Sequence, residues 1–262
     1  SEMCIRDRSV APVEAVKLLD STLVRLAEHT TVILTPGNHD SAVRLGFGSG
    51  LMRPGIHVLA STEGIEHPVS VTDEHGEVLF FGLPFLDPDV ARYELAGTGS
   101  EPLARSHEAV MQVAMDRVRS KIETYDGARS VVLAHTFLNG GVGSDSERDL
   151  TVGGVECVPG SVFAGVDYVA LGHLHGCQNM SGLVEGERPT AWYSGSPLAF
   201  SFSEARQKKS VLLVDMGADG STDVTPIPTP VPRRLVHVRG SLKDVLAAAD
   251  EHGDDWVHIT VQ

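Results

Sequence analysis

Apolar residues recur at helical spacing in two stretches of the chain. Residues 12–29 begin with a proline suited to a first helical turn and carry one apolar stripe, made of Val16, Leu19, Leu23, Leu26 and Ala27. Residues 102–124 repeat this spacing, with Val110, Val113, Ala114, Val118 and Ile122 on one side. Two amphipathic helices are therefore predicted. For the first stripe, burial in the core is favoured over contact with a second copy of the chain.

Short apolar runs without a helical period predict strands buried on both faces. Three such runs are TVILT at 31–35, SVVLA at 130–134 and DYVAL at 167–171. A hairpin is expected within residues 69–85, and two strands joined by a loop within residues 191–215. Glycine and serine are frequent between residues 140 and 165, which predicts mostly loop. The predicted fold class is α/β.

Prolines at positions 226, 228, 230 and 232 predict an extended linker. After it, the segments LVHVRG, SLKDVLAAADEH and WVHITVQ predict a strand, a helix and a strand, the opening of a small second domain. We therefore expect a main domain over residues 9–225 and a second domain from 226 to 262. Residues 1–8 are interpreted as a leader that is not native to the protein.

Composition bounds the class of protein. Hydrophobic residues make up 42% and charged residues 21% of the chain, as in soluble globular proteins. No apolar run approaches the roughly 20 residues that cross a bilayer, and the first residues do not form a signal peptide. The widely separated Cys4, Cys157 and Cys177 argue against a disulfide framework and favour a cytoplasmic location.

Charge alone would not suggest a nucleic-acid partner, because the formal net charge is −14. Bound divalent cations would offset part of that charge. Local basic clusters occur at residues 206–209 and 233–234, but each is equally well interpreted as solvated surface.

Polar side chains follow the three predicted buried strands. Asn38 and His39 follow the first strand, His135 follows the second, and His173 and His175 follow the third. Ligands of α/β sheets bind at the carboxyl ends of strands, and imidazole and amide oxygen suit transition-metal ions. Residues i and i+2 of an extended segment project to one side, so His173 and His175 are expected to face one pocket. The ordered set predicts a metal site, although a single histidine in a turn usually has no such role.

Five motifs carry a resemblance to a known family. They are GNHD at 37–40, LAHTFLNGG at 133–141, SDSERDLTVGG at 144–154, DYVALGHLHGCQ at 167–178 and YSGSPLAFSFSE at 193–204. The chain resembles the calcineurin-like metallophosphoesterase superfamily and, within it, the SbcD family of bacterial DNA nuclease subunits. The first and fourth motifs mark the superfamily, whereas the third and fifth narrow the resemblance to SbcD.

The resemblance implies a fold and a site. The expected fold is a four-layer α/β/β/α sandwich, incomplete at the N-terminus, followed by the start of a small α+β capping domain. Two divalent metal ions, Mn²⁺ or Mg²⁺, are expected. Asn38, His135 and His173 match ligands of one ion, and His175 matches a ligand of the other. His39 matches a catalytic histidine that protonates the leaving oxygen; Asp40 either orients His39 or only forms the turn.

The resemblance also implies a reaction and partners. SbcD proteins act with the SMC-like ATPase SbcC as ATP-dependent double-strand exonucleases and hairpin endonucleases, usually as a homodimer within a heterotetramer at the nucleoid. The family's first Asp-x-His motif has no counterpart here, and Cys4 stands where its bridging aspartate is expected. The chain is therefore expected to bind one ion weakly and to hydrolyse DNA negligibly. Two alternatives stay open: another phosphodiesterase or phosphatase of the superfamily, and a non-catalytic scaffold that binds SbcC.

Overall fold

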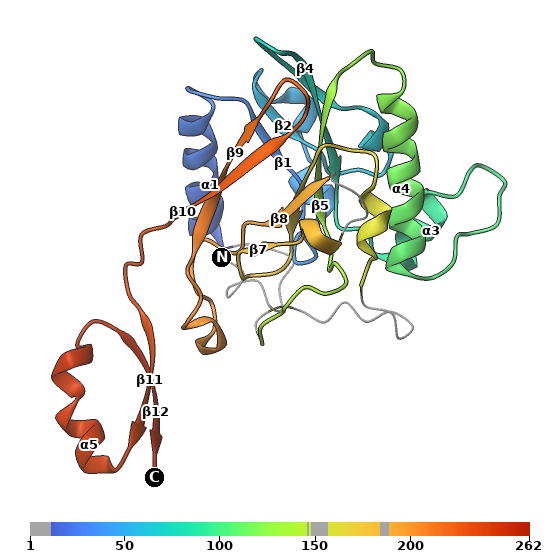
Figure 1. The fold of residues 1–262 in the computed structure, drawn as a ribbon. Helices are drawn as coiled ribbons and strands as arrows, with labels where there is room; N and C mark the ends of the chain where they lie inside the picture. Colours follow the sequence, from blue (N-terminus) through green and yellow to red (C-terminus); the bar gives the residue numbers. More distant parts are fainter. Residues whose placement is uncertain (1–11, 146, 148–156, 184–188) are drawn as a thin grey trace.

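A six-stranded sheet forms the centre of the computed structural model, which describes residues 12–145, 147, 157–183 and 189–262 (Figure 1). Its spatial order is β3-β4-β5-β6-β8-β7. The strands span β3 (Val69–Asp73), β4 (Gly76–Leu83), β5 (Arg129–His135), β6 (Tyr168–Gly172), β7 (Gln178–Asn179) and β8 (Thr190–Tyr193). The central four strands run parallel, and β3 and β7 pair antiparallel at the edges. The fold is therefore mixed α/β, as predicted.

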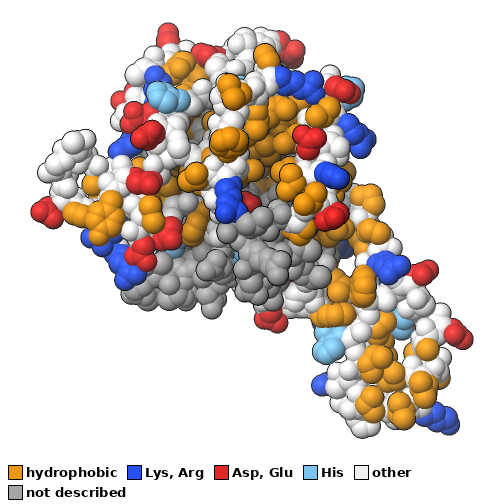
Figure 2. Space-filling view, turned by 180° about the vertical axis from the view of Figure 1, so that it is seen from behind, with side chains coloured by type: hydrophobic (Ala, Val, Ile, Leu, Met, Phe, Trp, Pro, Cys, Tyr) orange, Lys and Arg blue, Asp and Glu red, His pale blue; other side chains and the backbone are white. Residues whose placement is uncertain are grey.

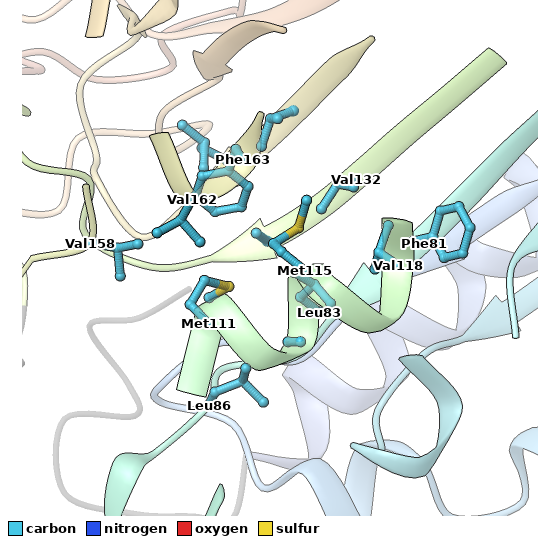
Figure 3. Close-up of a cluster of buried hydrophobic side chains, with 14 of the residues drawn as sticks. Phe81, Leu83, Leu86, Met111, Met115, Val118, Val132, Val158, Val162 and Phe163 are labelled. Carbon is cyan, nitrogen blue, oxygen red and sulfur yellow. The ribbon is translucent and has the colours of Figure 1, made fainter. Parts of the chain in front are cut away.

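One face of the sheet is covered by helix α4 (His107–Ile122). Alternate residues of the parallel strands point to this face, among them Phe81 and Val132, and they pack against Met111 and Met115 of the helix (Figure 3). The short helices α3 (Pro88–Glu94), η3 (Glu63–Glu66) and η4 (Gly160–Phe163) close the same layer. Strands covered on both faces form continuous apolar runs, which explains why the sequence revealed β5 and β6.

The opposite face of the sheet meets a two-stranded antiparallel sheet of β9 (Ser210–Met216) and β10 (Thr222–Pro228). Val131 and Tyr168 of the main sheet share an apolar cluster with Val214 and Val224. Beside this contact lies an open cavity of about 1130 Å³, lined by apolar side chains such as Phe80, Val131 and Val214 and by about as many polar ones. The second face is thus covered only in part by the described residues.

A second small sheet pairs β1 (Val32–Leu34) in parallel with β2 (Ile56–Val58), and the short helices α2 (Ala42–Leu45) and η2 (Ser49–Leu51) lie between them in sequence. A Cβ at Gly82 of β4 would lie 2.4 Å from Leu59 Cβ, so only glycine allows this close approach. The amide of Phe85 donates to the carbonyl of Pro36 at 3.0 Å. This contact holds the loop after β1 beside the end of β4. The strand predicted at 31–35 is present, but it is half-buried rather than buried.

Helix α1 (Val13–Leu26) confirms the helix predicted at 12–29, but the expected burial of its stripe is wrong. No residue of α1 is buried against the described part of the chain, and Val16 and Leu19 are 54% and 44% exposed. The helical spacing identified the apolar face correctly, but spacing does not specify which surface covers that face.

The expected extended linker is wrong at its start, because Pro226 and Pro228 belong to β10. Proline lacks the N–H that a strand donates to its neighbour, so it is tolerated on edge strands where that position faces away. The two prolines are two residues apart and therefore share one side of the ladder, opposite Leu212 and Ser210. Residues 229–234 then connect β10 to the last part of the chain.

Beyond this connection, the predicted strand, helix and strand are present as β11 (Leu235–Gly240), α5 (Leu242–Ala247) with η7 (Ala249–His252), and β12 (Trp256–Val261). β11 and β12 pair in parallel and stand apart from the main body in Figure 1. Apolar side chains gather on the surface of this unit (Figure 2). Its exposed apolar residues include Leu246 of α5 and Trp256 of β12. His237 Nε2 lies 3.0 Å from the carbonyl oxygen of Phe202, which links this unit to η6 (Phe202–Glu204).

Three features predicted from the sequence lie outside the described residues: the non-native leader at 1–8, the role of Cys4, and most of the third motif. Cys157 and Cys177 are unpaired. Among the described residues, no helix combines the length and the apolar character needed to cross a bilayer.

Candidate metal centre

Three of the predicted ligands meet at the carboxyl ends of β1, β5 and β6. Asn38, in the turn after β1, places its Oδ1 atom 3.0 Å from His135 Nε2 at the end of β5. The rings of His135 and His173 lie edge to face, with centroids 5.5 Å apart. The parallel pairing of His135 with Gly172 puts the last residue of β5 beside the start of the GHLH segment. Strand register and the β1 turn therefore bring these side chains together.

Two glycines make room for the ring of His135. A Cβ at Gly37 would lie 2.6 Å from His135 Cε1, and a Cβ at Gly172 would lie 2.9 Å from His135 Nδ1. The motifs that contain these glycines were predicted to be parts of the site. The structure gives a specific reason for glycine at both positions: any side chain there would displace the imidazole.

His173 has a backbone conformation that L-residues rarely adopt, with φ at 112°. It is the one non-glycine residue with positive φ among the described residues. Such conformations cost about 1–3 kcal/mol and cluster where the surrounding structure enforces them, often at functional sites. The chain therefore leaves strand geometry directly after β6. The expectation that His173 and His175 alternate along an extended strand is wrong. Both residues nevertheless line one cavity of about 190 Å³.

His175, which lines this cavity with His173, is held by contacts to its ring and to its backbone. Its Nδ1 atom lies 2.9 Å from Oε1 of Glu204, and its ring meets Phe200 edge to face with centroids 5.9 Å apart. The backbone amide of His175 donates to Oε1 of Glu147 at 2.7 Å. Side chain and backbone are thus fixed by carboxylates from two other segments, and the His175 side chain is only 4% exposed.

The turn after β1 places His39 next to Asn38, and both are half-buried. Asp40 is exposed, and its Oδ2 accepts a hydrogen bond of 2.8 Å from the amide of Gly37. The carbonyl of Gly37 in turn accepts from the amide of Asp40 at 3.1 Å. This hydrogen bond fits a turn-forming role for Asp40, and the orientation of His39 by Asp40 stays a prediction.

One buried tyrosine adds two hydrogen bonds to the backbone contacts that hold the loop after His135. The hydroxyl of Tyr193, which is fully buried, accepts from the amide of Leu138 at 2.9 Å and donates to the carbonyl of Thr136 at 2.7 Å. Burial raises the pKa of Tyr193 far above its usual 10.0. The hydroxyl therefore stays protonated and keeps both contacts at neutral pH.

The donor set of Asn38, His135 and His173 fits a divalent ion. Two ligand atoms that each lie about 2.1 Å from one ion at a right angle are about 3 Å apart, so the 3.0 Å between Nε2 and Oδ1 suits a shared ion as well as a hydrogen bond. Asn38 Nδ2 is buried and has no hydrogen-bond partner among the described residues, so the amide is not held by a second contact. The described part of the chain contains no group of three or more His, Cys, Asp or Glu side chains that could hold an ion. In the cluster at His135 and His173, the third donor is the amide oxygen of Asn38 instead.

Three residues around His175 could not be found from the sequence. Glu147 and Glu204 lie in quoted motifs but received no role, because two carboxylates far apart in sequence give no signal that they converge. Lys209 was counted with a solvated basic cluster, and that interpretation is wrong: its side chain is 3% exposed and contacts Glu204. The one signal that could have indicated a role for Glu204 was its position at the end of the motif at 193–204, which follows a predicted strand.

Three known proteins that are similar to the chain share one description. The SbcD component of the SbcCD nuclease of Bacillus subtilis is 34% identical over 242 residues, which cover 88% of this chain and 59% of that protein. The chain is similar to SbcD nuclease subunits over most of its length. The corresponding SbcD proteins of Staphylococcus epidermidis and Staphylococcus saprophyticus are each 28% identical, over 92% and 98% of this chain. The chain spans 59–65% of the length of these SbcD relatives. No family model matches it.

Proposed function

We propose that the chain carries the site of a DNA nuclease subunit that hydrolyses phosphodiester bonds with two bound divalent ions, Mn²⁺ or Mg²⁺. The observation that carries this proposal is the meeting of Asn38, His135 and His173 at the carboxyl ends of β1, β5 and β6. The similarity to SbcD relatives over most of the chain supports it. The packing of helix, sheet and second sheet is consistent with a metallophosphoesterase sandwich followed by part of a capping domain.

Each residue has a defined task in this proposal. Asn38, His135 and His173 would hold one ion, and His175 would offer Nε2 to the other, because its Nδ1 faces Glu204. Bound ions of this kind lower the pKa of a water and clamp the phosphate between them. His39, next to Asn38 in the turn after β1, would donate a proton to the leaving oxygen, a contribution of about 10²–10⁴-fold.

The partners are proposed on the same grounds. The substrate would be double-stranded DNA ends and hairpins, and an SbcC-type ATPase would bind the protein in the cytoplasm. The exposed apolar stripe of α1 is the candidate face for a homodimer within the larger assembly, since it is not used inside the described chain. Bound dications would reduce the repulsion between DNA and a chain with a formal net charge of −14.

Titration with Mn²⁺, followed by calorimetry, tests the metal centre directly. We expect the chain to bind Mn²⁺, and Asn38→Ala and His135→Ala to weaken this binding at least about 10-fold, since each removes one ligand. His29→Ala is the matched control, because His29 is exposed and lies outside the cluster. Equal Mn²⁺ affinity in all four proteins would refute the proposed centre.

Cleavage assays separate the proposed reaction from its alternatives. End-labelled duplex DNA and bis-p-nitrophenyl phosphate are offered with Mn²⁺ to the chain and to His39→Ala. We expect slow Mn²⁺-dependent cleavage of DNA, which His39→Ala abolishes without loss of bound Mn²⁺. Preference for the small diester would favour another phosphodiesterase of the superfamily. Binding to an SbcC-type ATPase without any cleavage would favour the scaffold alternative.

A further inference from the structure

Glu204 is the fully buried acidic residue of the site, with a relative exposure of 0%. Its two carboxylate oxygens face different partners. Oε1 lies 2.9 Å from His175 Nδ1, and Oε2 lies 2.5 Å from Lys209 Nζ. The Lys209 side chain is 3% exposed. A carboxylate and an ammonium group are therefore paired away from water, directly behind a proposed metal ligand.

Lys209 also fixes the backbone of His175. Its ammonium group donates to the carbonyl of His175 at 2.9 Å and to Ser196 Oγ at 2.8 Å. The amide of Ser196 donates to the same His175 carbonyl at 3.1 Å. Glu204 and Lys209 thus hold one histidine from two sides, one at the ring and one at the main chain.

This arrangement determines which ring nitrogen of His175 carries a proton. An ionised carboxylate only accepts hydrogen bonds, and the groups that donate to Oε2 include Lys209 and, at 3.4 Å, the amide of Phe200. Oε1 therefore accepts as well, and the donor facing it is Nδ1–H of His175. In a neutral imidazole with the proton on Nδ1, the lone pair is on Nε2.

We propose that Glu204 is a positioning residue that fixes His175 in the tautomer protonated at Nδ1, so that Nε2 is presented as a metal ligand. This proposal rests on the proposed function for the identity of the ion, but the tautomer itself is a property of the protein without metal. Buried ion pairs often add little net stability compared with apolar packing. Control of a neighbouring ligand's geometry and basicity is the role that such carboxylates commonly have.

The tautomer can be measured by long-range ¹H–¹⁵N NMR of the metal-free protein labelled at histidine, under alkaline conditions where a free imidazole is neutral. The signals of His175 are identified by their loss in His175→Asn. We expect a protonated Nδ1 and an unprotonated Nε2. A proton on Nε2 of the wild-type residue would overturn the proposal, whatever the variants below do.

Glu204→Gln is a nearly isosteric test. Lys209 and the Phe200 amide still require an acceptor at the Oε2 position, so the glutamine oxygen is expected there and its NH₂ group faces His175 Nδ1. The ring must then accept at Nδ1, and its proton moves to Nε2. Lys209→Met is the matched control, because it removes the same ion pair but keeps the Glu204 carboxylate at Nδ1. If Glu204 and Lys209 only stabilise the fold, both variants should lose stability and His175 should keep the same tautomer in both. That result would overturn the proposal.

Affinity for Mn²⁺ separates this proposal from the proposed function. If His175 is a ligand, Glu204→Gln should weaken Mn²⁺ binding about 10–100-fold, the range found when partners of metal-bound histidines are lost. A changed tautomer with unchanged Mn²⁺ affinity would support the positioning role and refute His175 as a ligand. An unchanged tautomer with weaker Mn²⁺ binding would refute the positioning role and leave the metal centre in place.

Discussion

Replacement of Tyr193 by phenylalanine tests whether the loop after β5 is held by a single hydroxyl group. The ring would keep its packing, since Tyr193 lies in the main core and is fully buried. The loss is confined to two hydrogen bonds, one from the amide of Leu138 and one to the carbonyl of Thr136. Both of these residues are buried, with exposures of 0% and 2%, so water cannot easily replace the hydroxyl.

The expected cost follows from the groups left without a partner. Leaving one buried donor or acceptor unsatisfied costs about 1–3 kcal/mol, so the loss of two partners should lower the free energy of unfolding by at least about 2 kcal/mol in Tyr193→Phe. With an m-value of about 3 kcal/mol per M, the urea midpoint falls by at least about 0.7 M. The assay is urea unfolding followed by circular dichroism.

Tyr93→Phe is the matched control, because Tyr93 is 62% exposed and its ring packs against the guanidinium of Arg92, a contact that phenylalanine keeps. Its free energy of unfolding should change by less than about 0.5 kcal/mol. Equal midpoints for Tyr193→Phe and the wild type would show that the backbone contacts with Val158 and Gly172 hold the loop without the hydroxyl, and the reasoning about Tyr193 would be wrong.

Three further changes are predicted to affect stability. Gly37→Ala would place a Cβ 2.6 Å from an imidazole carbon, so its urea midpoint should fall by the equivalent of about 1–3 kcal/mol; Gly50→Ala, with open space around it, should not show this loss. Burial raises the pKa of Tyr168 to about 12 from its usual 10.0. The tyrosine of the unfolded chain therefore loses its proton first, and the free energy of unfolding falls as pH rises through that interval. Tyr168→Phe should show a smaller fall in urea midpoint over the same interval. The hydrogen bond from Arg129 lowers the pKa of Asp73 below its usual 3.8, so this contact stabilises the fold above that pH and is lost as pH falls. Asp73→Asn should therefore be less stable than the wild type in neutral thermal melts, and the difference should shrink in acid.

Much of the fold could be predicted because burial on both faces leaves a continuous apolar run in the sequence. The strands β5 and β6 were found for this reason, and so were the polar residues that follow them. Parallel strands carry their carboxyl ends to one edge, which was enough to predict that His135 and His173 would be neighbours.

The parts of the fold and site that were not predicted depend on contacts between side chains that sequence patterns do not reveal. The stripe of α1 has the same pattern whether it lies in a core or on a surface. Lys209 resembles a solvent-exposed residue until a buried carboxylate is known to lie beside it. Glu204 stands at the end of a serine-rich loop, although it contacts a histidine 29 residues earlier. Each of these cases concerns what packs around a side chain in the folded protein rather than the local conformation of the backbone.

The prolines of β10 have a consequence for how the molecule behaves at high concentration. An outer strand with a full row of free amide and carbonyl groups can recruit a strand from a neighbouring molecule and so start aggregation. Pro226 and Pro228 remove two amide donors from the side of β10 that β9 does not use. The hairpin can therefore lie beside the large open cavity without offering its outer edge as a template for intermolecular sheet growth.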